Sequence, residues 1–179
     1  MIDCGANRGK WSTIFADLGA QVIAFEPDPV AFKALEESAR GRAGMHVRNS
    51  AAGVSDGTVR LYFHTNRDAN PLDYSSGSSL LESKPNVSSE FTEVTSIDLS
   101  RVVTESSLDV EILKIDIEGY EVELLPHLIS TGAIDKIRKV FVETHEKKWP
   151  DLELATRRLI KLADAVEARG ATEFHFDWP

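Results

Sequence analysis

The sequence predicts an α/β domain with a three-layer, doubly wound, Rossmann-like architecture, in which a mostly parallel sheet lies between two layers of helices. Strand-like and helix-like segments alternate along most of the chain, as they do in consecutive βαβ units. The strand-like segments are short apolar runs, which is typical of strands buried on both faces. The chain of 179 residues has the length of one domain, and we expect residues 1–179 to form a single domain.

The first half of the chain contains three predicted strands and two predicted helices. In order, they are a short strand at 2–4, a helix at 10–18, a strand at 21–25, a helix at 30–39 and a weaker strand at 45–48. Gly19 ends the first helix, and Pro27 and Pro29 mark the start of the second. The apolar residues expected to share an inward face are Trp11, Ile14, Phe15 and Leu18 in the first helix and Phe32 and Leu35 in the second.

The middle of the chain contains an expected antiparallel pair of strands and a long connection. Residues 59–63 and 91–95 alternate apolar and polar side chains, which predicts the pair. The connection, residues 64–90, is rich in Ser, Asn, Asp, Pro and Gly. Because compact domains seldom contain about 20 residues without structure, this segment is expected to be either a lid or binding loop, or a flexible insertion.

The second half returns to alternating strands and helices. We expect a strand at 110–116, a helix at 120–129, a strand at 139–143, a helix at 152–169 and a strand beginning at 171. The last helix is amphipathic, with its apolar face formed by Leu152, Ala155, Leu159, Leu162, Ala163 and Val166.

Composition excludes several classes of protein. With 42% hydrophobic and 27% charged residues, the chain is neither disordered nor a small disulfide-rich scaffold. Twenty Lys and Arg against 29 Asp and Glu give a net charge of −9 without a basic run, which argues against a nucleic-acid partner. The single cysteine, Cys4, permits no intrachain disulfide and is expected to be a small buried packing residue. No apolar stretch or signal peptide is recognisable, so we expect a cytoplasmic protein without a membrane partner.

The ends of the first two strands carry the residues that suggest a cofactor. Ligands of doubly wound sheets bind at the carboxyl ends of the strands, where Gly5 and Gly9 form a turn that lets a ligand approach the backbone. The turn lacks the Gly-x-Gly-x-x-Gly pattern of dinucleotide sites, and Asp3 would suit a ligand with an ammonium group. Glu26, 23 residues later, is placed to accept hydrogen bonds from two ribose hydroxyls. Together they favour S-adenosylmethionine over the alternative roles, which are a helix cap for Asp3 and a surface acid for Glu26.

Six segments of the chain resemble the FkbM-type family of class I, S-adenosylmethionine-dependent methyltransferases. They are IDCGANRGKWS at 2–12, AFEPDP at 24–29, NSAAG at 49–53, SSL at 78–80, LKIDIEGYE at 113–121 and VETH at 142–145. They occur in the order expected for the family and span about four-fifths of the chain. The resemblance implies S-adenosylmethionine as cofactor, and it implies methyl transfer to a hydroxyl group.

The resemblance also implies roles for individual residues. The residues around the amino-acid end of the cofactor would be Asp3, Gly5, Ala6, Asn7, Gly9 and Ser12. Glu26 would hold the ribose, Phe25 and Pro27 would shape the adenosine pocket, and Ser50 and Ala51 would flank the adenine. Asp116 would lie near the methyl group and the substrate.

Three residues are candidates for catalysis, namely Asp116, Glu143 and His145. Asp116 begins a segment with three carboxylates, one of which would act as a general base. Glu118 is equally a helix cap, and Glu121 is expected on a solvated face. Glu143 and His145 leave the next strand at the same edge, where His145 would act as acid, base or substrate binder. Some class I O-methyltransferases bind a divalent cation at such positions, but Glu-x-His is also a common substrate-binding pair, and we predict no metal.

The predicted function is methylation of a hydroxyl on a small molecule or glycan. One alternative is a nicotinamide-dependent oxidoreductase, which also needs a glycine turn and a ribose-binding acid. The other is a catalytically silent cofactor-binding module, because the family's sheet usually closes with an antiparallel strand after 174–176 that this chain lacks. A homodimer is compatible with each of these three functions.

Overall fold

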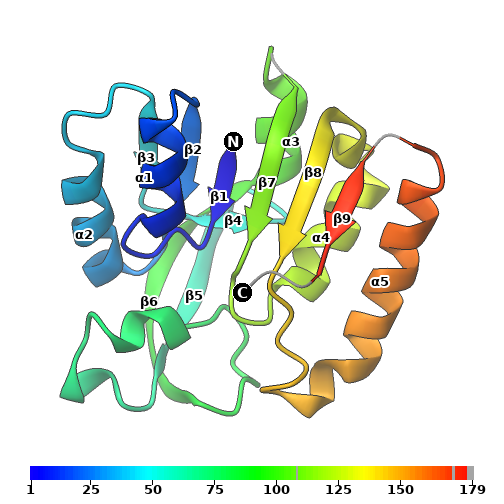
Figure 1. The fold of residues 1–179 in the computed structure, drawn as a ribbon. Helices are drawn as coiled ribbons and strands as arrows, with labels where there is room; N and C mark the ends of the chain where they lie inside the picture. Colours follow the sequence, from blue (N-terminus) through cyan, green and yellow to red (C-terminus); the bar gives the residue numbers. More distant parts are fainter. Residues whose placement is uncertain (108, 171, 177–179) are drawn as a thin grey trace.

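The computed structural model describes residues 1–107, 109–170 and 172–176, and its centre is a six-stranded sheet (Figure 1). The sheet has the order β3-β2-β1-β7-β8-β9, and every neighbouring pair in it is parallel. Its strands are β1 (Ile2–Cys4), β2 (Val22–Phe25), β3 (Met45–Arg48), β7 (Val110–Ile115), β8 (Ile137–Val142) and β9 (Glu173–His175). The predicted doubly wound sheet is thus confirmed. Of the strand predicted from 171 onward, residues 171 and 177–179 lie outside the described ranges.

Five helices cover the two faces of the sheet. They are α1 (Lys10–Asp17) and α2 (Pro29–Ala39) on one face, and α3 (Leu99–Glu105), α4 (Glu121–Ser130) and α5 (Glu153–Glu167) on the other. Alternate residues of each strand separate the two packing regions: Ala24 packs with Leu35 of α2, whereas Phe25 belongs to the larger core with α4. Within the described ranges, no helix is long and apolar enough to cross a membrane.

The inward face predicted for α1 is partly wrong. Ser12 is the buried residue of this helix, whereas Leu18 is 78% exposed and Ile14 is 44% exposed. The inward position of Ser12 is stabilised by the hydrogen bond that its hydroxyl donates to the buried Asp3 carboxylate, 2.6 Å away. In α5 the predicted face is largely confirmed, although Leu162 is 42% exposed.

A second, three-stranded sheet lies beyond the first. β5 (Gly57–His64) and β6 (Val87–Asp98) form the predicted antiparallel pair, and β4 (Ala51–Gly53), a strand that was not predicted, pairs with β6 in parallel. The intervening segment 65–86 contains two short 3-10 helices, η1 (Arg67–Ala69) and η2 (Tyr74–Gly77). Tyr62 and Ser79 exchange two backbone hydrogen bonds, so the segment is folded onto β5. Two further 3-10 turns are η3 (Ala133–Lys136) and η4 (Pro150–Leu152).

The strand order reverses between β1 and β7. From β1 the chain adds β2 and β3 on one side, and from β7 it adds β8 and β9 on the other. The strands of this sheet are all parallel, and the arrowheads of β7, β8 and β9 point toward the lower half of Figure 1, where segment 65–86 also lies. A ligand site is expected at this point, because the connections leaving β1 and β7 run in opposite directions and open a crevice between them.

Candidate functional site

A cleft lies at the carboxyl ends of β1, β2 and β7. It is open to solvent and is lined by residues that leave these strands. Segment 65–86 forms one wall, to which Ser75, Ser78 and Ser79 belong. Six of the predicted site residues line the cleft: Gly5, Asn7, Glu26, Pro27, Ala51 and Asp116.

The glycine turn after β1 is held against the end of β2. The backbone amides of Gly5 and Ala6 both donate to the carbonyl oxygen of Phe25, at 3.1 and 3.0 Å. Gly5 has φ +76°, and a Cβ atom there would lie 1.7 Å from the backbone oxygen of Asp116, so only glycine fits. Asn7 also adopts a left-handed conformation, and its backbone amide donates a hydrogen bond to Glu26.

Glu26 is a buried carboxylate at the edge of the cleft. It is only 5% exposed, and its two oxygens accept hydrogen bonds from the backbone amides of Asn7 and Asp28, both at 2.8 Å. Burial raises the pKa of Glu26 to about 8, although these two amides act in the opposite direction. Each oxygen keeps acceptor capacity toward the cleft, which is the capacity that a pair of ribose hydroxyls requires.

Asp3 lies behind the cleft and is fully buried. Instead of a ligand's ammonium group, the ammonium of Lys114 lies beside it, 3.2 Å from Oδ1, because the two residues are register partners on β1 and β7. Lys114 also donates to the Gly5 carbonyl at 2.9 Å and lies 3.4 Å from Oδ2 of Asp116. Burial lowers the pKa of Lys114, but the two carboxylates outweigh burial and raise it. Asp3 and Ser12 thus lie inside the protein, and their contact with a cofactor stays a prediction.

Four further predicted cofactor residues lie outside the lining of the cleft. Phe25 and Ala6 are buried in the two packing regions, and Ser50 is buried beside β4. A Cβ on Gly9 would lie 2.8 Å from Leu35, so this glycine is required by helix packing. None of these four is among the residues lining the described cleft, and their predicted contact with a cofactor stays a prediction.

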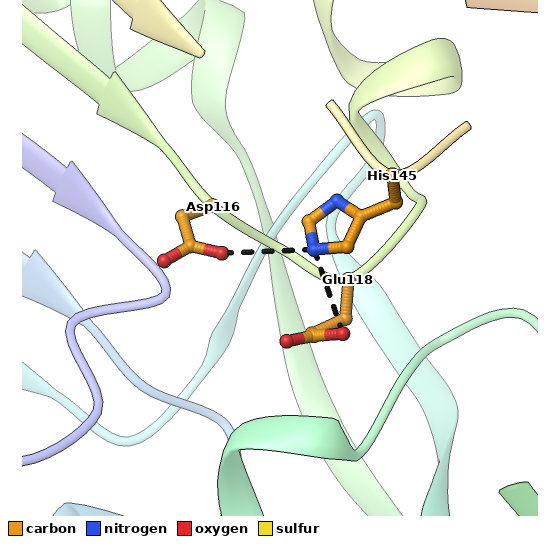
Figure 2. A group of neighbouring side chains, drawn as sticks. All are labelled: Asp116, Glu118 and His145. Atoms are coloured by element: carbon orange, nitrogen blue, oxygen red, sulfur yellow. Dashed lines mark ion pairs between the residues drawn. The ribbon is translucent and has the colours of Figure 1, made fainter. Parts of the chain in front are cut away.

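An acidic cluster surrounds His145 at the other end of the cleft, and Figure 2 shows part of it. His145 is 1% exposed, and its Nδ1 lies 2.9 Å from Glu121 Oε1. Its Nε2 lies 3.5 Å from Glu118, 3.9 Å from Glu143 and 4.0 Å from Asp116. Burial lowers the pKa of His145, but the carboxylates of Glu118 and Glu121 outweigh burial and raise it to about 10. Burial also raises the pKa of Asp116. The three predicted catalytic residues therefore lie together, and Glu118 joins them.

The family is now decided by comparison with known proteins. The model of the methyltransferase FkbM domain matches residues 3–169. The chain belongs to the FkbM methyltransferase family. This membership favours methyl transfer over the nicotinamide alternative.

A solved structure of another FkbM protein shows the same fold. The crystal structure of methyltransferase FkbM from Methylobacillus flagellatus KT matches with a TM-score of 0.52 at 16% sequence identity. The match covers 90% of this chain and 36% of that one, so this chain spans about a third of that protein. No sequence among curated proteins matches the chain significantly.

In this FkbM domain Glu121 has a different place from the one predicted. It is fully buried, and its two oxygens contact His145 Nδ1 and the backbone amide of Gly119, the latter at 2.9 Å. The expectation of a solvated Glu121 is therefore wrong. The helical period contained the signal, because Glu121 precedes Leu124, Leu125 and Leu128 by three, four and seven residues and so shares their buried face.

Segment 65–86 is attached to both ends of the cleft through residues that the sequence did not single out. Lys84 is 7% exposed, and its ammonium donates to Glu118 Oε2 at 2.6 Å and to the Gly77 carbonyl at 2.7 Å. At the opposite end, Arg67 forms an ion pair with the buried Asp28, which also caps α2. Of Lys84, Arg67 and Asp28, only Asp28 has a recognisable sequence signal, because it is an acid directly before a proline at the start of a helix.

Backbone strain also occurs at the cleft. Glu118 has φ +56°, a left-handed conformation that costs a residue other than glycine about 1–2 kcal/mol. The conformation is maintained by Ser79, whose hydroxyl donates to the Glu118 carbonyl at 2.8 Å, and by the ion pair with Lys84. Strain of this kind is concentrated at functional sites, which agrees with the position of Glu118 in the cleft wall.

Proposed function

We propose that this FkbM domain is an S-adenosylmethionine-dependent O-methyltransferase that acts on a hydroxyl group of a small molecule or glycan. The observation that carries the proposal is a single cleft at the reversal of strand order, with the buried Glu26 carboxylate at one end and the acidic cluster around His145 at the other. Family membership supplies the reaction type, methyl transfer.

The residues of the cleft fit an adenosine-type methyl donor. Glu26 would accept from the ribose hydroxyls, and Pro27, Ala51 and Leu61 would provide apolar contacts for the adenine. The backbone of the Gly5 turn would lie along the rest of the cofactor, ending near Asp116. When bound, S-adenosylmethionine supplies a methyl group on a positively charged sulfur.

Asp116 is the proposed acceptor of the proton that the substrate hydroxyl loses. In the reaction the hydroxyl oxygen forms a bond to the methyl carbon, the bond between carbon and sulfur breaks, and the proton passes to a base. Asp116 lines the cleft and is 28% exposed, whereas the His145 ring is buried behind it. Much of the rate would come from positioning the oxygen in line with the methyl group.

The proposed acceptor class is supported by the wall that segment 65–86 forms. Ser75, Ser78 and Ser79 line the cleft, and because their hydroxyls donate within the protein, to the Leu72 carbonyl, Asp28 and the Glu118 carbonyl, they would offer a polyhydroxylated acceptor their remaining lone pairs. A polar wall of this kind supports a small polar molecule or glycan. The buried, free thiol of Cys4 supports the proposed cytoplasmic setting.

Calorimetric titration with S-adenosylhomocysteine, the product form of the cofactor, tests the cofactor assignment. We expect binding by the native protein and at least about tenfold weaker binding by Glu26→Ala, because a buried pair of hydroxyl contacts is lost. Glu36→Ala, which removes an exposed acid from α2, is the matched control and should bind as the native protein does. No binding by the native protein, or equal binding by Glu26→Ala, would contradict the proposal.

A further inference from the structure

We propose that Asp116, Glu118 and His145 form a binding site for a divalent first-row transition-metal cation such as Mn²⁺ or Zn²⁺. Each residue offers one ligand atom, and the three atoms lie within 4.8 Å of one another. Figure 2 shows the two carboxylates and the Nε2 atom of His145 directed toward a common point. This proposal departs from the prediction that no metal is bound.

His145 has the arrangement of a metal ligand. Its Nδ1 contacts the Glu121 carboxylate, which only accepts, so Nδ1 carries a hydrogen, and Nε2 is the nitrogen whose lone pair a cation would take in place of the second proton of the charged ring. Nε2 is buried and makes no hydrogen bond to any residue in the described part of the chain. Histidines that bind metals commonly give their other ring nitrogen to a carboxylate, which fixes the orientation of the ring. Glu121 is itself fixed by the Gly119 amide.

The charges around the site favour a divalent cation. Five carboxylates face three ammonium groups in the connected network, a formal excess of one negative charge with His145 protonated and of two once a cation has replaced the Nε2 proton. The carboxylates are Asp3, Asp116, Glu118, Glu121 and Glu143, and the ammonium groups are Lys84, Lys114 and Lys148. Uncompensated charge in a buried setting is costly, and one divalent cation would balance it.

The separations and the donor set fit coordination of one ion. Ligand atoms bound at about 2.0–2.2 Å to one ion lie roughly 3–3.5 Å apart, so the observed 3.5 and 4.0 Å from Nε2 require only small side-chain movements. One imidazole with two carboxylates suits Mn²⁺ or Zn²⁺ better than Ca²⁺ or Mg²⁺, which prefer oxygen ligands alone. Asp116 and Glu118 line the cleft, so the remaining coordination positions face the space for the acceptor.

Such a cation would define the acceptor more closely. A hydroxyl bound to the ion ionises more readily, so an acceptor with a second oxygen next to the reacting hydroxyl would chelate the ion and react at neutral pH. This role rests on the proposed methyl transfer, whereas the binding site itself does not.

Lys84 is the natural competitor for the cation. Its ammonium lies 2.6 Å from Glu118 Oε2, so the cation must displace it from that oxygen. Lys84→Met should therefore tighten Mn²⁺ binding about tenfold, since it removes a positive charge in direct contact with a ligand.

Electron paramagnetic resonance titration of chelator-treated protein with MnCl₂ tests the site, because bound Mn²⁺ loses the sharp spectrum of the free ion. We expect one Mn²⁺ per chain, displaced by Zn²⁺, and at least about tenfold weaker binding by Glu118→Gln. Glu123→Gln, an exposed acid nearby on α4, is the matched control and should bind normally. Thermal unfolding with and without Mn²⁺ checks that both variants fold and should show stabilisation of the native protein and the control only.

Two outcomes would overturn the proposal. One is the absence of bound Mn²⁺ and Zn²⁺ at millimolar concentrations, which would leave Lys84 as the permanent cation of the cluster. The other is that Glu118→Gln binds Mn²⁺ as tightly as the native protein does, which would indicate that the ion binds to acidic residues on the surface instead. Titration of the same preparations with S-adenosylhomocysteine separates these failures from failure of the proposed cofactor site, because Glu26 and the metal ligands lie at different ends of the cleft.

Discussion

Raising the pH from 7 to 9 should strengthen binding of the cofactor's nucleoside part about tenfold, because Glu26 has to ionise to accept from both ribose hydroxyls. Burial raises the pKa of this carboxyl to about 8, opposed by two backbone amides. With that pKa, roughly one molecule in eleven carries an ionised Glu26 at pH 7, and roughly nine in ten do at pH 9. Affinity should therefore rise through pH 8 and level off above it.

Calorimetric titrations with adenosine at half-unit steps from pH 6 to pH 9 measure this effect. Adenosine is preferable to the whole cofactor because it has no amino-acid group that titrates in the same range. Glu26→Gln removes the ionisation and should bind weakly with no dependence on pH. Constant affinity of the native protein across this range, or an unchanged pH slope in Glu26→Gln, would refute both the raised pKa and the ribose contact.

Three further substitutions test the framework of the site. Gly5→Ala should destabilise the fold by at least about 3 kcal/mol in urea unfolding, because its Cβ would overlap a backbone oxygen. The control Gly19→Ala has the same sign of φ but open space around it, and should cost only about 1 kcal/mol. Equal costs for the two variants would contradict the steric argument. Lys114→Met should cost about 3–5 kcal/mol by leaving Asp3 buried without its cation, and adding Asp3→Asn should recover part of that loss; additive losses would show that the two residues are not coupled. Glu121→Gln should weaken Mn²⁺ binding about 10- to 100-fold, because this positioning residue holds the imidazole of His145, and S-adenosylhomocysteine binding should change little. Unchanged Mn²⁺ affinity would mean that the His145 ring does not need the Glu121 carboxylate for its orientation.

The fold and the two ends of the cleft were largely predictable because they depend on local signals. Alternating strands and helices predicted the sheet, and the residues leaving each strand predicted Glu26, Asp116 and His145 at one edge. The pairing of Asp3 with Lys114 could not be predicted because it depends on strand register. Lys114 is 111 residues away in the sequence, and only the pairing of β1 with β7 brings it opposite Asp3.

Contacts made by segment 65–86 were the least predictable part of the site. The ion pair between Lys84 and Glu118 joins residues 34 apart, and the pair between Arg67 and Asp28 joins residues 39 apart. No periodic sequence pattern predicts either ion pair, because all four residues lie in connections and not in strands. The polar composition that suggested a flexible insertion is explained by these contacts, because the segment forms a wall of the cleft.

Lys114 links the two halves of the site. Its ammonium binds the Gly5 carbonyl on the cofactor side and lies beside Asp116 Oδ2 on the acceptor side, which leaves Oδ1 directed toward His145. A buried ion pair contributes little net stability, because desolvation offsets much of the attraction. Its consequence here is geometric: the glycine turn and the carboxylate that we propose as the base are held by one cation, so a shift at either end would move the other. Transfer of a methyl group in line with an acceptor oxygen requires this fixed relation between the two ends of the cleft.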